Sequence, residues 1–213
     1  MRTLECDADI QAAVTNLVDL ETRFAMVIET HGHPSLRRMN TGLEALLRIV
    51  TDQLISLQAG AAIWRRIETE LAPFDPAAIA RRREASLRRL GLSGAKARSF
   101  KAVAKAVADG VLDFELLANL SDADVLAALT TLRGIGPWTA DVYLLSAMGR
   151  ADAWPAGDLA LQAAAQNLFG LDTRPNHKQL IQMAEHWRPW RSVAARLLWS
   201  HYRGLKGMSQ AVA

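Results

Sequence analysis

The sequence has 213 residues, a formal net charge of +3 and an isoelectric point near 9.3, values that admit nucleic acid as a partner without establishing it. Cys6 is the single cysteine, which excludes an internal disulfide, a thiolate zinc site and a cysteine-held iron–sulfur cluster. The N-terminus has no apolar signal core and no apolar run approaches the ~20 residues that cross a membrane, so we expect a soluble, cytoplasmic protein with no membrane partner.

The composition favours an all-α fold. Half of the residues are hydrophobic, and Ala, Leu and Arg dominate over β-branched runs. The chain is long enough for one domain or two small helical lobes. The predicted helices run over 7–28, over 41–71 with a break near residues 58–60, from 76, from 95, and over 121–132, 138–148, 158–169, 177–187 and 190–203.

The segment from residue 81 to residue 105 is strongly basic, with Glu84 as its single carboxylate. A turn ending at Gly94 interrupts it and can cap a helix that begins at Ala95. The N–H groups of that helix start, with Lys96 beside them, form a candidate phosphate contact. Acidic residues cluster after the basic segment, and this polarised charge favours a one-sided footprint on DNA.

The stretch from residue 121 to residue 148 predicts two short helices joined by a glycine hairpin. Gly134 and Gly136 allow positive φ at both positions and a close approach to a partner, while Ile135 between them can anchor the turn in the core. Pro137 suits the first turn of the second helix. Unpaired N–H groups of that helix follow a small backbone nest, which is a phosphate-binding geometry.

A family signature spans this hairpin and the loop after it, and its residues are Leu132, Gly134, Ile135, Gly136, Thr139 and Ala140, then Trp154, Pro155, Gly157 and Asp158. The order resembles the helix-hairpin-helix, Gly/Pro-rich loop, Asp signature of DNA base-excision glycosylases. The AlkA-type family, 3-methyladenine DNA glycosylase II, is the most similar, in its short form without an N-terminal α/β domain. The resemblance runs from about residue 43 to residue 202.

The resemblance implies a single glycosylase unit over residues 1–213 that is built from two helical lobes. One lobe would hold approximately residues 1–40 and 159–213, and the other approximately residues 41–158. The helix-hairpin-helix motif and the catalytic Asp158 would face the cleft between them.

Asp158 would be the catalytic residue of such an enzyme. It lies at or beside the start of the predicted helix 158–169, where the helix dipole favours an ionised carboxylate. Cleavage of an N-glycosidic bond develops positive charge on the deoxyribose. A fixed carboxylate next to C1′ stabilises that charge and can orient or deprotonate the attacking water. Taken alone, the residue is better interpreted as an N-cap; the hairpin upstream reverses that preference.

The resemblance also implies the base pocket and the reaction type. Trp199 would be the aromatic floor for the flipped base, with Trp138 and Val142 lining the pocket. An indole face attracts a cationic ring such as an N-alkylated purine. Family members that also cut the strand carry a lysine nucleophile where this chain has Trp138, so the resemblance implies a monofunctional enzyme without AP lyase activity that uses water. Val142 stands where the family often has an aromatic residue.

DNA contacts follow from the same resemblance. Leu54 would be an apolar wedge that fills the gap left by the flipped base, and N–H groups of the hairpin would hold a phosphate. A monovalent cation would sit on the main-chain carbonyls of Thr130, Leu132 and Ile135, and no other cofactor is expected. The predicted DNA-binding residues are Gln53, Leu54, Lys96, Gly134, Ile135, Gly136, Trp138 and Thr139.

The sequence therefore predicts a monomeric DNA glycosylase of the 3-methyladenine type that releases 3-methyladenine and 7-methylguanine from double-stranded DNA and initiates base excision repair. One alternative is a glycosylase for neutral lesions (hypoxanthine, ethenoadenine or uracil), for which Gln53, Asp141 and Tyr143 are the candidate donors to the leaving base. The other alternative is a non-catalytic DNA-binding module. Asp158 argues against it, because a binder has no need of a carboxylate near phosphates.

Overall fold

The computed structural model describes residues 2–207. Over this range the regular elements are helices, and the one pairing of extended backbone is an isolated bridge between Thr3 and Arg150. The predicted all-α fold is therefore confirmed. The described residues form two compact units, one made of the chain up to Arg38 together with the chain from Leu144 onward, and one made of residues 39–143.

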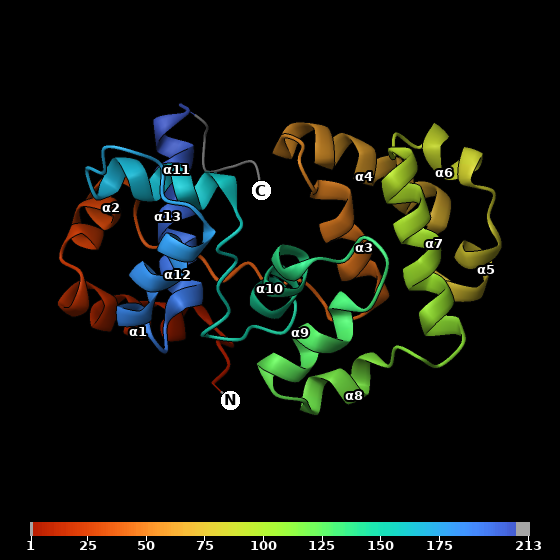
Figure 1. Cartoon of the computed structure of the whole chain (residues 1–213), viewed down its shortest axis with the longest axis horizontal. Helices are drawn as coiled ribbons and strands as arrows, with labels where there is room; N and C mark the ends of the chain where they lie inside the picture. The colour runs from red at the N-terminus through yellow and green to blue at the C-terminus, as the bar shows by residue number, and fades with distance from the viewer. Residues whose placement is uncertain (1, 208–213) are drawn as a thin grey trace. The chain divides into compact units, whose positions relative to one another are not determined.

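The first unit is organised around one central helix. Its helices are α1 (Asp7–Leu20), α2 (Arg23–His31), α11 (Leu159–Leu168), α12 (His177–Ala184), the short 3-10 helix η1 (Glu185–Trp187) and α13 (Arg191–Leu205). Helices α1, α2 and α11 pack on α13 (Figure 1). The run from Ser192 to Leu198 on α13 is buried on all sides, as expected of a helix surrounded by others.

Aromatic rings fill the part of this core under η1. Trp187 contacts Phe24, Trp154 and Phe169, with ring centroids 5.3, 5.5 and 5.7 Å away. Edge-to-face and offset contacts of this kind each add about 0.5–1.5 kcal/mol beyond the area they bury. Trp187 is thus a packing residue.

The second unit has two halves in sequence, one before and one after the long helix α7. Its helices are α3 (Leu43–Asp52), α4 (Leu57–Leu71), α5 (Pro76–Arg81), α6 (Glu84–Arg89), α7 (Gly94–Ala108), α8 (Phe114–Asn119), α9 (Asp122–Thr130) and α10 (Pro137–Ser146). Helices α3, α5 and α6 pack against α7 (Figure 1). Trp64 of α4 stacks on Phe74 at 5.4 Å and is also a core residue.

Two helix breaks differ from the prediction. The predicted helix 7–28 is interrupted after Leu20, and the break in 41–71 lies at residues 53–56 rather than at 58–60. Gly60 misled the prediction because it lies inside α4 for a packing reason. A Cβ at Gly60 would come within 2.1 Å of a carboxylate oxygen of Asp52, so a side chain there would force Asp52 to move.

The unit boundary also lies elsewhere than expected. The chain passes from the second unit to the first at residues 143 and 144, inside α10, whereas the predicted lobes meet at residues 158 and 159. The intervening segment is bonded to the first unit: the N–H of Leu4 donates to the Gly149 carbonyl at 2.7 Å, and the N–H of Ser192 donates to the Ala151 carbonyl at 3.0 Å. Among the described helices, none is both long and apolar enough to cross a membrane.

Candidate active site and nucleic-acid interface

Asp158 is the N-cap of α11. Its Oδ1 accepts hydrogen bonds from the N–H groups of Ala160 (2.8 Å) and Leu161 (2.9 Å). These donors are among the first N–H groups of the helix, which have no partner within it. They fix the rotamer of the carboxylate. The side chain is half-buried.

The loop before Asp158 is held by the start of α13. The Ser192 hydroxyl donates to the carbonyls of Arg150 (2.6 Å) and Ala153 (3.0 Å). The Arg191 guanidinium donates to both the carboxylate and the carbonyl of Asp152 at 2.8–2.9 Å. The segment from Trp187 to Ser192 therefore ends in two side chains that position the loop carrying Asp158, which the sequence alone did not indicate.

The glycine hairpin between α9 and α10 has the predicted shape at one glycine and not at the other. Gly134 has φ +80°, and a Cβ there would lie 1.8 Å from the Ser99 hydroxyl of α7. Gly136 is not among the glycines with positive φ, which corrects the prediction, and a Cβ there would meet nothing within 4 Å. Ile135 between them is buried and anchors the turn. Gly136 thus leaves open space beside the backbone, whereas Gly134 allows the hairpin to pack closely against Ser99 of α7.

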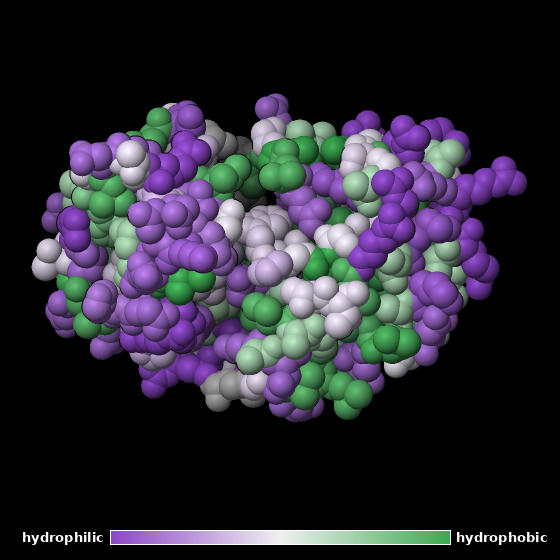
Figure 2. Space-filling model, viewed as in Figure 1, coloured by the Kyte–Doolittle hydropathy of each residue, from purple (hydrophilic) through white to green (hydrophobic). Residues whose placement is uncertain are grey.

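Leu54 lies in the turn between α3 and α4 in a conformation that is unusual for leucine. Its φ is +56° and its side chain is 93% exposed. A positive φ at a residue with a branched side chain costs on the order of 1–3 kcal/mol and persists only when the surroundings impose it. Ile55 and Leu57 are also partly exposed, and Figure 2 shows the apolar patch where α4 begins. The turn between α3 and α4 therefore exposes a small cluster of apolar side chains, with Leu54 the most exposed.

Gln53 joins this turn to the hairpin. Its side-chain amide donates to the carbonyl of Gly134 (3.1 Å) and to the hydroxyl of Thr139 (2.8 Å). The side chain of Thr139 is buried. In this structure the side chains of Gln53 and Thr139 thus contact each other. Leu54 and the hairpin are consequently fixed relative to each other within the second unit.

Five of the nine basic side chains in the segment 81–105 contact other groups of the protein. Lys96 and Lys101 donate to main-chain carbonyls, and Arg82, Arg98 and Lys105 form ion pairs with Glu70, Glu84 and Asp109 at 2.7–3.1 Å. For Lys96 this differs from the predicted phosphate contact. A run of positive charges in the sequence carries no information on which carbonyl or carboxylate it will meet in the fold.

The predicted base-pocket residues lie on two helices of different units. Trp138 and Val142 are four residues apart on α10, and Trp199 lies on α13; all three are half-buried. Tyr143 is almost completely buried instead. Its hydroxyl accepts the N–H of Gly42 at 2.9 Å, and burial raises the pKa of Tyr143 to about 12. A tyrosine enclosed in this way is a core residue and not the donor to a leaving base considered above.

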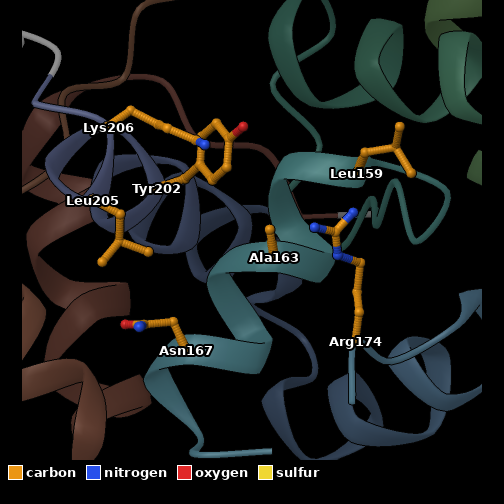
Figure 3. A pocket seen from close by; sticks show the side chains of 7 residues that line it. All are labelled: Leu159, Ala163, Asn167, Arg174, Tyr202, Leu205 and Lys206. Atoms are coloured by element: carbon orange, nitrogen blue, oxygen red, sulfur yellow. The ribbon is translucent and has the colours of Figure 1, made fainter. Parts of the chain in front are cut away.

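A surface hollow of about 430 Å³ lies in the first unit between α11 and α13. Leu159, Ala163 and Asn167 line it from α11, and Tyr202 lines it from α13 (Figure 3). It also includes Arg174, Leu205 and Lys206, and Figure 3 shows the Lys206 side chain over the Tyr202 ring. None of the predicted base-pocket residues lines this hollow.

The part of the chain from residue 2 to residue 207 contains no group of three or more His, Cys, Asp or Glu side chains that could hold a metal ion. The predicted cation ligands are main-chain carbonyls. That of Leu132 accepts the N–H of Ile135 at 3.1 Å, which leaves its second lone pair for another contact.

Comparison with known proteins places these features in a family. The profile of the HhH-GPD superfamily base excision DNA repair proteins matches residues 47–189. The chain is 34% identical over 124 residues to the putative DNA-3-methyladenine glycosylase YfjP of Bacillus subtilis, covering 58% of this chain and 43% of that protein. It is 30% identical over 160 residues to DNA-3-methyladenine glycosylase 1 of Schizosaccharomyces pombe, covering 73% of this chain and 70% of that protein.

A solved structure of the S. pombe 3-methyladenine DNA glycosylase Mag1 in complex with abasic DNA superimposes with a TM-score of 0.82 at 27% identity, and the match covers 92% of this chain and 97% of the other. The chain spans less than half the length of YfjP. The matched profile contains the hairpin and the loop ending in Asp158, the two features on which the sequence resemblance rested. This chain therefore belongs to the HhH-GPD superfamily of base excision DNA repair proteins.

Proposed function

We propose that this protein is a DNA glycosylase that hydrolyses the N-glycosidic bond of alkylated purines, 3-methyladenine and 7-methylguanine in particular. The observation that carries the proposal is the fixed carboxylate of Asp158 at the N-terminus of α11, inside the matched family region. The names of the relatives and the Mag1 complex with abasic DNA support the same substrate class.

In this reaction Asp158 acts on the sugar rather than on the base. The bond between C1′ and the purine nitrogen breaks, and its electron pair leaves with the base. Positive charge then develops on the deoxyribose, and the preorganised carboxylate stabilises it. Water adds its oxygen to C1′ and gives its proton to the carboxylate, leaving an abasic site. An N-alkylated purine is cationic and leaves as a neutral base, so the site needs no second carboxylate to protonate it.

The remaining site residues have proposed roles in holding the DNA. Leu54 inserts into the base stack as an apolar wedge. The N–H groups of Gly134, Gly136 and Trp138 bind a phosphate of the damaged strand, and the open space at Gly136 lets the backbone come close. Trp199 stacks on the flipped base, and Trp138 and Val142 contact it.

We propose that the enzyme is monofunctional, because Trp138 occupies the position at which a lysine nucleophile would be required for a Schiff base. The main-chain carbonyls of Thr130, Leu132 and Ile135 would hold a monovalent cation that screens the bound phosphate. The proposal takes the protein as a cytoplasmic monomer acting on double-stranded DNA.

The neutral-lesion alternative is less well supported. It requires side-chain donors that stabilise the leaving base. Two of the three candidates, Gln53 and Tyr143, are engaged elsewhere: the Gln53 amide bonds the hairpin, and Tyr143 is buried against Gly42. A cationic leaving group needs no such donors.

The test is base release from methylated double-stranded DNA, with the free bases separated by chromatography. We expect 3-methyladenine and 7-methylguanine, intact strands until alkaline treatment, and no complex trapped by borohydride. Cleaved strands or a trapped complex would refute the monofunctional reaction. Release of hypoxanthine, ethenoadenine or uracil without the methylated bases would refute the substrate class, and binding without any release would refute catalysis.

A further inference from the structure

The ammonium group of Lys96 points into the second unit, onto the turn that carries Leu54. Its Nζ donates to the carbonyls of Thr51 (2.8 Å) and Gln53 (2.6 Å). Thr51 lies in the last turn of α3 and Gln53 is its C-cap, where carbonyls lack partners within the helix and attract cations. Burial lowers the pKa of Lys96, and the nearby Asp52 carboxylate opposes that shift. One charged side chain from α7 thus closes the end of α3.

The turn beyond these carbonyls needs external support. Leu54 holds φ +56° with its side chain in solvent, so nothing that its side chain touches can impose the conformation. The support comes from its neighbours. The Gln53 side chain is bonded to the hairpin, the Gln53 carbonyl is bonded to Lys96, and the Ser56 hydroxyl accepts the N–H of Ala59 at 3.2 Å to begin α4.

We propose that Lys96 is a positioning residue for the Leu54 wedge. Its ammonium fixes the Gln53 carbonyl so that Leu54 meets the duplex at a constant offset from the phosphate-binding hairpin. This inference rests on the proposed function of Leu54. It also explains why Lys96 faces inward: two of its three N–H donors are used within the protein. Without the ammonium, the turn relaxes in the free protein and must be ordered again during each insertion.

The chain contains a matched control on the same helix. Lys101 of α7 donates in the same manner to the carbonyls of Ala80 and Arg82, at the end of α5. Both lysines are partly buried and both close a helix end, but the turn held by Lys101 carries no wedge. K96M and K101M therefore remove the same kind of contact from two turns of the second unit while keeping most of the side-chain volume. K96R retains a cation that can donate to two carbonyls.

The first measurement is amide hydrogen exchange of residues 53–56 in the free protein. We expect faster exchange in K96M and no change there in K101M. The second is single-turnover base release with 2-aminopurine beside the lesion, which reports unstacking. Ordering one backbone residue corresponds to a loss of roughly 5- to 30-fold in K96M, with the 2-aminopurine signal reduced in step. K101M should match wild type, and K96R should recover most of the rate.

The double variant K96M/L54A distinguishes positioning from general damage. If Lys96 acts through Leu54, K96M removes nothing further once Leu54 is alanine. The slope of the logarithm of the DNA-binding constant against the logarithm of the salt concentration should be the same in K96M and wild type. If Lys96 instead contacted a phosphate, its loss would reduce the magnitude of this slope by about 1.

Equal behaviour of K96M and K101M, full additivity with L54A, or a reduced salt slope would each overturn the inference. A wild-type protein that releases no base would refute the proposed function instead, and hydrogen exchange would still decide whether Lys96 holds the turn.

Discussion

Asp158 can be tested as a catalyst separately from its role as a helix cap. Asparagine caps a helix about as well as aspartate, whereas alanine loses the cap at about 1 kcal/mol. D158N keeps an oxygen for the N–H groups of Ala160 and Leu161 and loses only the charge–dipole attraction, about 0.3–1 kcal/mol. For a chain of this length that corresponds to a fall in Tm of roughly 1–4 °C. Loss of the charge beside C1′ should nonetheless lower single-turnover base release about 10²- to 10⁴-fold.

Asp113 provides the matched control for this comparison. It is the N-cap of α8, and its Oδ1 accepts the N–H groups of Glu115 (2.8 Å) and Leu116 (3.2 Å), the same arrangement as at Asp158. D113N should therefore shift Tm by a similar amount and leave base release unchanged. Both variants should bind DNA, as measured by fluorescence anisotropy. The reasoning would be refuted by a D158N protein that remains as active as D113N, because Asp158 would then be a cap and nothing more.

Three further substitutions test the hairpin and the core. G134A should lower the free energy of unfolding in urea by more than ~1 kcal/mol, because alanine is strained at φ +80° and its Cβ would overlap the Ser99 hydroxyl. G136A should leave the stability nearly unchanged and weaken DNA binding. A G136A protein that is destabilised but binds DNA normally would contradict the proposed phosphate contact at Gly136. Tyr143 has a raised pKa, so its contribution to stability is complete below the unfolded value near 10 and is lost as the pH rises through about 12. Absorbance titration of the two tyrosines should show one ionising only near pH 12, and Y143F should remove that step; two tyrosines that both titrate near pH 10 would contradict the burial.

The sequence was most informative where local chemistry decides the structure. Ser121, Ser93 and Asp75 cap helices that begin within a residue or two of the predicted starts, because a side-chain oxygen at the right spacing satisfies the first N–H groups wherever the helix lies in the fold. Asp158 was assigned in the same way, and its cap geometry is the predicted one. These features need only a few consecutive residues, so a single sequence can reveal them.

Features that depend on distant partners were not predictable. Gly60 was expected to break a helix, but it lies inside α4. It accommodates the Asp52 carboxylate at the end of α3, and the sequence does not show that these two residues meet. Lys96 looked like a phosphate ligand because nothing in the sequence shows that two carbonyls of α3 lie beside it. Gln53 was assigned to DNA, although its amide meets a hairpin more than eighty residues later in the chain. In each case the partner within the protein lies far away in the sequence or in another helix, so a single sequence cannot show it.

The position of Asp158 depends on contacts with residues far away in the sequence. The carboxylate is oriented by its own helix, but the loop that delivers it is held by Ser192 and Arg191 at the start of α13. The Arg191–Asp152 contact is bidentate and partly buried, the kind of ion pair that fixes geometry as well as contributing energy. Rate acceleration by a preorganised charge depends on its being in place before the reaction begins. In the proposed reaction, the contacts of Ser192 and Arg191 therefore serve to keep residues 150–158 where α11 presents the carboxylate.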